Sequence, residues 1–177
     1  PPATGGPSEV LVVMDSVQWA SSLGDAIRST FAATIPNLPQ PEPYYHLIHI
    51  KPESFNSVLR KVQNIILVTT LDLEGTSKKH LNKYFTNNTL QKISKGTDQF
   101  YQFQNDIYAK NQQFLYLFGN NEAALTANIH ASNKKLRNHF RRLEINRKIK
   151  TMYAKKEMIG INKLIESNYH CQLRIPQ

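Results

Sequence analysis

Carboxylates and one amide in the first quarter of the chain are the side chains whose types could do chemistry. Asp15 follows the apolar run 10–14, which predicts a short strand that is buried on both faces. Open α/β sheets place ligands beyond the carboxyl ends of such strands, so a site built on this strand would begin at Asp15. We predict a candidate ligand or partner surface from five residues: Asp15, Trp19, Asp25, Gln40 and Glu42.

Two carboxylates in one pocket would give this surface hydrolase chemistry, and Asp15 with Glu42 is the pair that could supply it. The structural alternative is stronger. Asp15 is a good helix N-cap, Gln18 could complete a capping box, and Trp19 could be a lid on the edge of the core rather than a wall beside Asp15. Asp25 would lie about 15 Å from Asp15 along one helix, too far for a catalytic pair. We therefore predict no catalytic residue and no cofactor.

The sequence motifs give little support to a metal site or to nucleophilic catalysis. The chain has no Gly-rich phosphate loop, no HExxH and no GxSxG. His46 and His49 are three apart on a predicted strand and so face opposite sides, which argues against a shared metal ion. The single cysteine, Cys171, cannot form an internal disulfide, and its neighbour His170 would face the other side of a strand. We predict a structural cysteine and no metal site.

A basic segment, residues 134–156, carries the whole net charge of +9 in this 177-residue chain. It has ten Lys or Arg against one acid, Glu144, whereas the remaining residues have twelve of each sign. Three interpretations are phosphate contacts to nucleic acid, binding to an acidic lipid or glycan, and a solvated helix face. We favour the solvated face, because the charges surround the helix and no nucleic-acid-binding motif accompanies them. The basic surface is predicted at Lys134, Arg137, Arg141, Arg142, Arg147 and Lys148.

The elements that must position these residues alternate between strand and helix. One helix is predicted at 17–31 and another begins at Pro52. The proline-rich stretch 35–43 predicts a stiff connector, with a presented recognition segment as the alternative. Three strands are predicted at 9–15, 44–50 and 64–70. This β-α-β-α-β order predicts a largely parallel sheet.

The second half of the chain predicts an antiparallel addition and a long helix. Strands at 99–109 and 113–119 would pair through a tight turn at Lys110-Asn111. A helical stretch at 121–157 has a predicted break at Ser132-Asn133. The remaining elements are predicted as short helices around 81–85, 90–93 and 162–166 and a final strand at 170–175.

Together these elements predict an α/β or α+β fold. We expect a mixed, mainly parallel sheet of five to six strands with packed helices and one long basic helix. We predict that residues 1–8 form a flexible leader and that residues 9–177 form a single domain. No apolar run approaches the roughly 18–20 residues that span a bilayer.

Short motifs spread through most of the chain carry a resemblance to a known family. They are Glu-Val-Leu-Val-Val-Met-Asp at 9–15 with Trp19, Gly-Asp-Ala at 24–26, Leu-Pro-Gln-Pro-Glu-Pro at 38–43, His49-Ile50 before Pro52 and Phe55, Asn-Ile-Ile-Leu-Val at 64–68, Ile-Tyr-Ala-Lys at 107–110 with Gln112, and Ile175-Pro176. With these motifs the chain resembles the N-terminal half of an uncharacterised lipoprotein family of Bacteroidetes bacteria.

The resemblance implies a location and no activity. It implies a lipid anchor on the full-length protein, a place in the cell envelope at the outer membrane or periplasm, and a second half after this chain. The expected function is therefore a non-enzymatic envelope domain with a binding or structural role, whose partner is an envelope protein, a glycan or an anionic lipid. The alternatives are a nucleic-acid-binding module that uses 134–156 and an envelope hydrolase with carboxylates at the end of strand 9–15.

Overall fold

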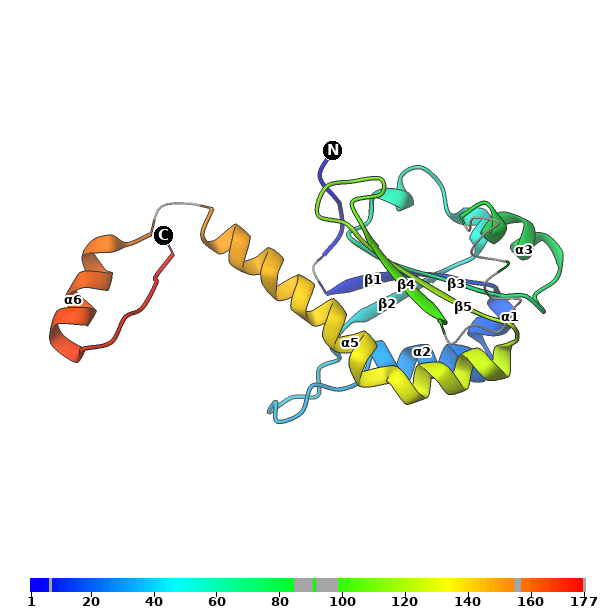
Figure 1. Ribbon diagram of the computed structural model, residues 1–177, viewed down its shortest axis with the longest axis horizontal. Helices are drawn as coiled ribbons and strands as arrows, with labels where there is room; N and C mark the ends of the chain where they lie inside the picture. The colour runs from blue at the N-terminus through cyan, green and yellow to red at the C-terminus, as the bar shows by residue number, and fades with distance from the viewer. Residues whose placement is uncertain (7, 85–90, 92–98, 155–156, 177) are drawn as a thin grey trace. The chain divides into compact units, whose positions relative to one another are not determined.

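A computed structural model describes residues 1–6, 8–84, 91, 99–154 and 157–176. The chain forms two compact units, residues 1–137 and 138–177. The first unit is built on a five-stranded sheet with the order β2-β1-β3-β5-β4 (Figure 1). Its strands are β1 (Glu9–Val13), β2 (His46–Ile50), β3 (Asn64–Thr70), β4 (Tyr101–Asn105) and β5 (Gln113–Gly119).

The sheet is mixed and mainly parallel, as predicted. β1 runs parallel to β2 and β3, and β5 runs parallel to β3. β4 is antiparallel to β5 and lies at one edge. All seven residues of β3 are buried, which explains why its apolar run, 65–68, is continuous rather than alternating.

Side chains of the central strands alternate between two apolar layers. One layer contains Leu11, Val13 and Ile65 with Phe55 and Leu81, which come from outside the sheet. Figure 1 shows α2 (Ser22–Phe31) and the start of α5 (Glu122–Met152) on one face of the sheet and α3 (Gly75–Asn82) on the other. The alternation of side chains along each strand thus gives the sheet two buried faces, each with its own helical cover.

The predicted helix at 17–31 is wrong as a single element. It is two helices, α1 (Ser16–Trp19) and α2, and the Ser21 hydroxyl accepts from the Leu23 N–H to begin the second one. Val17 is 77% exposed, so it is not part of the buried stripe that Leu23 and Phe31 form. The Ser21 cap competes with a continuous helix for the Leu23 N–H. In a continuous helix this N–H would donate to a backbone carbonyl one turn earlier, whereas here it donates to the serine hydroxyl.

The predicted helix after Pro52 is also wrong. The segment instead forms two short 3₁₀ turns, η1 (Pro52–Ser54) and η2 (Leu59–Lys61). The Asn56 side-chain oxygen accepts from the N–H groups of Val58 and Leu59, at 3.0 and 3.1 Å. These local bonds start a new turn inside the apolar pattern, and Val58 is left 71% exposed.

The proline-rich segment 35–43 connects α2 to β2 as a projecting loop. Thr34 and Pro43 form an antiparallel bridge, and the Ile35 N–H donates to the Glu42 carbonyl. The segment therefore leaves α2 and returns close to its starting point before β2 begins (Figure 1).

The predicted hairpin at 99–119 is confirmed, with a longer turn. Residues 106–112 connect β4 to β5. Asp106 and Asn111 have φ of 56° and 65°, a left-handed conformation that these two residue types tolerate better than most. The Gln112 N–H donates to the Asp106 carboxylate, which closes the loop.

Other predictions fall partly outside the described residues. α3 takes the place of the short helix expected around 81–85, but residue 85 is not described. The second short helix, around 90–93, lies outside the described residues apart from Gln91. The division into a leader and one domain stays a prediction. In the structure, Thr4 of the leader exchanges backbone hydrogen bonds with Lys61 and Gln63.

The second unit contains the end of α5 and the helix α6 (Ile159–Tyr169). α5 continues through Ser132-Asn133, so the predicted break is wrong, whereas the predicted last helix is confirmed and is longer. The predicted strand at 170–175 is wrong: among the described residues no strand pairs with this segment, and next to it Glu157 and Pro176 form an isolated bridge. Cys171 is exposed, so it is not a buried structural cysteine.

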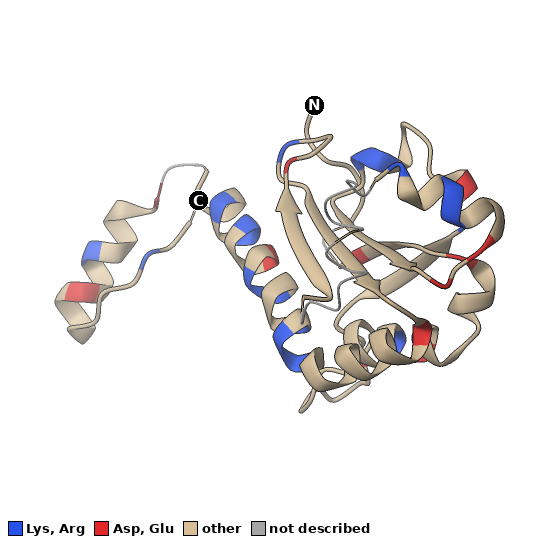
Figure 2. Cartoon of the chain, turned by 45° about the vertical axis from the view of Figure 1, so that its right-hand side comes forward, with Lys and Arg blue, Asp and Glu red and all other residues tan. Residues whose placement is uncertain are grey.

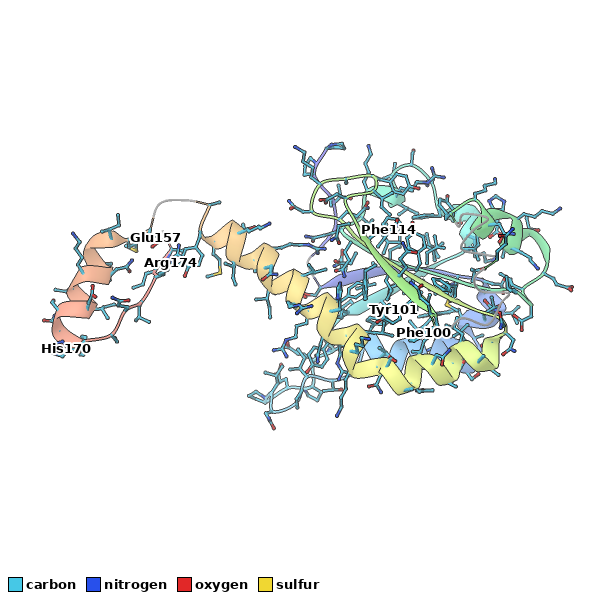
Figure 3. All side chains as sticks on the ribbon, viewed as in Figure 1. Phe100, Tyr101, Phe114, Glu157, His170 and Arg174 are labelled. Atoms are coloured by element: carbon cyan, nitrogen blue, oxygen red, sulfur yellow. The ribbon has the colours of Figure 1, made fainter. Side chains whose placement is uncertain are left out.

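One ion pair closes the end of the second unit. The Arg174 guanidinium donates to the Glu157 carboxylate, and Figure 3 shows the two labelled side chains facing each other. This hydrogen bond lowers the pKa of Glu157 and raises the pKa of Arg174. The Tyr153 hydroxyl donates to the Arg174 carbonyl at 2.7 Å, so the residue that follows α5 is tied to the segment after α6.

Candidate functional site

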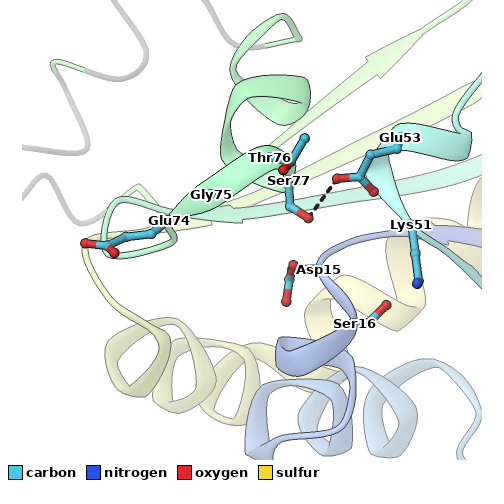
Figure 4. Close-up of a pocket in the computed structure, with 8 residues that line it drawn as sticks. All are labelled: Asp15, Ser16, Lys51, Glu53, Glu74, Gly75, Thr76 and Ser77. Carbon is cyan, nitrogen blue, oxygen red and sulfur yellow. Dashed lines mark hydrogen bonds between the residues drawn. The ribbon is translucent and has the colours of Figure 1, made fainter.

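An open polar pocket lies beyond the carboxyl ends of the parallel strands. Its volume is about 560 Å³, and Figure 4 shows the side chains around it. The lining comes from three segments that follow β1, β2 and β3: Asp15 and Ser16, Lys51 and Glu53, and Glu74, Gly75, Thr76 and Ser77.

Strand order explains why a pocket lies here. β2 lies on one side of β1, and β3 lies on the other side. The connection after β1 therefore leaves in one direction, and the connection after β2 crosses to the opposite side of β1. Such a reversal opens a crevice at the carboxyl edge of a parallel sheet, where open α/β proteins bind ligands.

Asp15 links the pocket to the start of α1. Its carboxylate accepts from the N–H groups of Val17, at 2.8 Å, and Gln18, at 3.4 Å, so the predicted N-cap is confirmed. The capping box is wrong, because the Gln18 amide instead donates to the Thr70 hydroxyl at 2.7 Å. Gln18 thus ties α1 to the end of β3.

Glu53 and Ser77 join the second and third segments of the pocket. The Ser77 hydroxyl donates to the Glu53 carboxylate at 3.0 Å. Figure 4 places the Asp15 carboxylate below this hydrogen bond, with Glu74 pointing away from it. Glu74 is the N-cap residue of α3, and its side chain makes no capping bond. The first N–H groups of α3 therefore border the pocket and are not capped by a side chain. They add partial positive charge on the side of the pocket opposite Asp15.

Trp19 and Asp25, two predicted site residues, meet at a different place. The Trp19 ring stacks on His49 with centroids 4.9 Å apart, and the Arg28 guanidinium lies 4.5 Å from the Trp19 ring centre. Arg28 also donates to the Asp25 carboxylate at 2.7 Å and to the Trp19 carbonyl. The His49 ring is 3.0 Å from the Met14 carbonyl. This cluster attaches α2 to the edge strand β2.

The two remaining residues of the predicted surface, Gln40 and Glu42, are exposed on the projecting loop. Neither of them lines the pocket, whereas Asp15 does. The structure thus distributes the predicted surface over the pocket, the Trp19 cluster and the loop. Glu53, Glu74 and Ser77 are pocket residues that sequence reasoning missed. The only sequence signal for the segment after β3 is the predicted parallel sheet, because the carboxyl ends of parallel strands lie at the same edge.

An aromatic cluster around Arg60 was also missed. The Arg60 guanidinium lies 5.3 to 5.8 Å from the ring centres of Phe55, Tyr84 and Tyr108, and it donates to the Tyr84 hydroxyl at 2.7 Å. Tyr116 lies close to this cluster. Burial of its side chain raises its pKa to about 12, and Tyr108 and Tyr84 raise it further. These rings come from distant segments with no shared motif, so no local pattern reveals them. Their contacts pack one side of the sheet.

The predicted basic surface contains residues with different environments. Arg137 is half-buried, donates to the Thr30 carbonyl at 3.2 Å and lies over the Tyr44 ring. Lys148 pairs with Glu144 at 2.8 Å. Arg147 is half-buried, and three others, Lys134, Arg141 and Arg142, are exposed. Figure 2 shows Lys and Arg recurring along the later turns of α5.

Fold and pocket define the class: a mixed α/β domain with an open polar crevice at the carboxyl edge of its parallel strands. A family model described as a domain of unknown function, DUF8532, matches residues 3–153, and the chain belongs to this family. No curated protein and no solved structure matches the chain. Within the described part of the chain, no helix is both long and apolar enough to span a membrane. The same residues hold no metal-binding group of three His, Cys, Asp or Glu side chains.

Proposed function

We propose that the chain is a non-enzymatic binding domain of a cell-envelope lipoprotein, and that it holds a small polar ligand in the pocket at the ends of β1, β2 and β3. The observation that carries the proposal is the pocket itself, at the reversal of strand order. Its polar groups have structural roles that also fix their positions. Asp15 caps α1, and Ser77 donates to Glu53. Positioned, hydrogen-bonded groups suit selective binding.

The charge of the lining indicates the ligand's chemistry. The residues that line the pocket include three with carboxylates, Asp15, Glu53 and Glu74, and one with an ammonium group, Lys51. A ligand that bears an amine would be attracted to this surplus of negative charge, and its hydroxyl groups would hydrogen-bond to the carboxylates and to the hydroxyls of Ser16 and Thr76. An amino sugar has this combination of groups.

A pair of sugars tests the pocket. Glucosamine carries the amine, and N-acetylglucosamine is its neutral counterpart, so titrating each into ¹⁵N-labelled protein isolates the charge. We expect glucosamine to shift the amide signals of Asp15, Ser16 and Ser77 and to saturate at a lower concentration than N-acetylglucosamine. Equal responses to both sugars, or shifts confined to the second unit, would overturn the proposed site.

Asp15→Asn supplies the matched variant. An asparagine oxygen can still accept from the α1 N–H groups, so the fold and the cap should be kept while one negative charge is lost. We expect weaker glucosamine binding by about 3- to 10-fold with an unchanged unfolding midpoint. Steady turnover of an added substrate that Asp15→Asn abolishes would contradict the non-enzymatic assignment.

The envelope location is supported by the sequence resemblance to lipoproteins, which spans most of the chain. Fractionation of cells that carry the full-length protein, together with metabolic labelling by a palmitate analogue, tests it. We expect label on the protein and recovery in the envelope fraction. An unlabelled protein in the cytoplasmic fraction would exclude the lipoprotein assignment without affecting the pocket. The family itself favours neither nucleic-acid binding nor hydrolysis.

A further inference from the structure

The C-terminal half of α5 carries an exposed apolar stripe. Ile145, Ile149 and Met152 are 44%, 46% and 52% exposed. Their spacing of i, i+4 and i+7 places them on one line along the helix. Side chains of this size leave substantial apolar surface in water, and three of them in a row form a continuous patch rather than scattered exposure.

Basic side chains flank this stripe. Arg141 and Arg142 precede Ile145 by four and three residues. Around the helix axis, Arg141 therefore lies about 40° to one side of Ile145, and Arg142 lies about 60° to the other side. Lys148 lies on the same side as Arg141, and all three cations are exposed. Figure 2 shows Lys and Arg on the later turns of α5. An apolar line between two basic margins is the pattern of helices that lie in a membrane interface.

We propose that this face of α5 docks on an anionic membrane surface. Ile145, Ile149 and Met152 would enter the boundary of the acyl chains, and Arg141 and Arg142 would contact lipid phosphates beside them. The inference depends on α5 alone and does not require a ligand in the pocket. It assigns a partner to the only exposed apolar line along α5 within the described residues.

Charge and polarity separate this partner from two others. The second unit, residues 138–177, has nine Lys or Arg against three Asp or Glu, so a second copy would bring two strongly positive surfaces together. Nucleic acid would neutralise the charges but would leave the isoleucines against phosphates and water. An anionic bilayer satisfies both the cations and the apolar stripe.

Flotation of the 177-residue chain with lipid vesicles tests the proposal. One set is pure phosphatidylcholine, and the other contains about one-third phosphatidylglycerol. We expect the chain to float with the anionic vesicles and not with the neutral ones, and to be released as the salt concentration rises. Equal flotation with both sets would overturn the proposal, as would failure to float at low salt.

Two double variants separate the charge from the apolar stripe. Arg141→Gln with Arg142→Gln is expected to lower partitioning by about 30-fold, at roughly one fivefold factor per charge. Ile145→Ser with Ile149→Ser is expected to lower it by about 10-fold. All four residues are exposed, so the variants should fold, and circular dichroism checks this.

Matched controls lie elsewhere in the chain. Lys79→Gln with Lys83→Gln removes two exposed charges near α3, and Ile161→Ser with Leu164→Ser removes exposed apolar groups from α6. We expect much smaller losses of partitioning from these controls. Losses equal to those of the α5 variants would show nonspecific adsorption and overturn the proposal. A stable dimer in sedimentation that Ile145→Ser with Ile149→Ser dissociates would also overturn it in favour of a second copy.

Discussion

Single side chains in this protein have roles that depend on their neighbours more than on their type. Asp15, the most promising carboxylate in the sequence, is an N-cap that also lines a pocket. Asp25, which has the same chemistry, instead holds Arg28 against Trp19. The same contrast holds for the histidines: the His49 ring stacks on Trp19, whereas His46 is exposed on the edge strand.

His139 gives a prediction at this scale. Burial lowers its pKa below the ordinary 6.5, and the positive charge of Arg142 lowers it further. We expect its ring to titrate below 6.5 in NMR, and Arg142→Gln to move the midpoint part of the way back, because burial remains. Lys150→Gln is the control, since it removes an equal charge about three turns from His139 along α5 and should leave the midpoint unchanged. A midpoint at or above 6.5 in the unaltered protein would contradict the environment described.

The sign of the linked stability change follows from the lowered pKa. As the pH falls through 6.5, the unfolded chain takes up a proton at this histidine before the folded chain does. The contribution of neutral His139 to stability is therefore fully present above pH 6.5. It is lost as the pH falls from 6.5 to the pKa of the folded state. His139→Gln should flatten the pH dependence of the urea midpoint in that window.

At the scale of elements, short local bonds decide where helices begin and end. The serine cap at Ser21 separates α1 from α2, and Asn56 divides the segment after β2 into 3₁₀ turns. The break between α1 and α2 brings the Trp19 carbonyl close to Gly24. A Cβ atom at Gly24 would lie 1.9 Å from that oxygen, so only glycine fits there without a shift of the backbone.

Gly24→Ala tests this close approach. We expect a loss of about 2 kcal/mol or more in the free energy of unfolding, because backbone atoms must move to admit the methyl group. Urea denaturation measures it. Gly160→Ala is the matched control, since no atom lies within 4 Å of the added Cβ and the residue is inside α6. The control should lose no stability and can gain up to about 1 kcal/mol. Equal effects of the two substitutions would contradict the contact.

On the scale of the whole molecule, burial is concentrated in the middle of the sheet. β3 is buried along its full length, and β5 is buried at all but its last residue. The edge strand β2 has no fully buried residue, and neither does α6 in the second unit. Local opening should therefore require much less free energy at α6 than at the central strands.

Hydrogen exchange checks this gradient. We expect the amides of β1, β3 and β5 to exchange slowest, those of β2 and β4 faster, and those of α6 fastest. α6 has 11 residues, and isolated helices shorter than about 12–15 residues are marginal in water, so packing must supply their protection. Protection of α6 equal to that of β3 would show that something buries it in solution, such as a second copy, and would contradict the exposure described.

The amino-acid sequence by itself determined the central strands, the mixed and mainly parallel sheet, the hairpin, the long helix and the Asp15 cap. Continuous apolar runs such as 10–14 and 65–68 have one favourable place, the middle of a sheet with both faces buried, and a cap depends only on residues next to it. The tertiary structure alone decided the pocket and the Arg60 cluster. Both join segments that are far apart along the chain, and only strand order and packing bring Asp15 together with Glu53 and Ser77. The same cause explains the missing strand at 170–175, because a strand persists only where another strand offers hydrogen-bond partners.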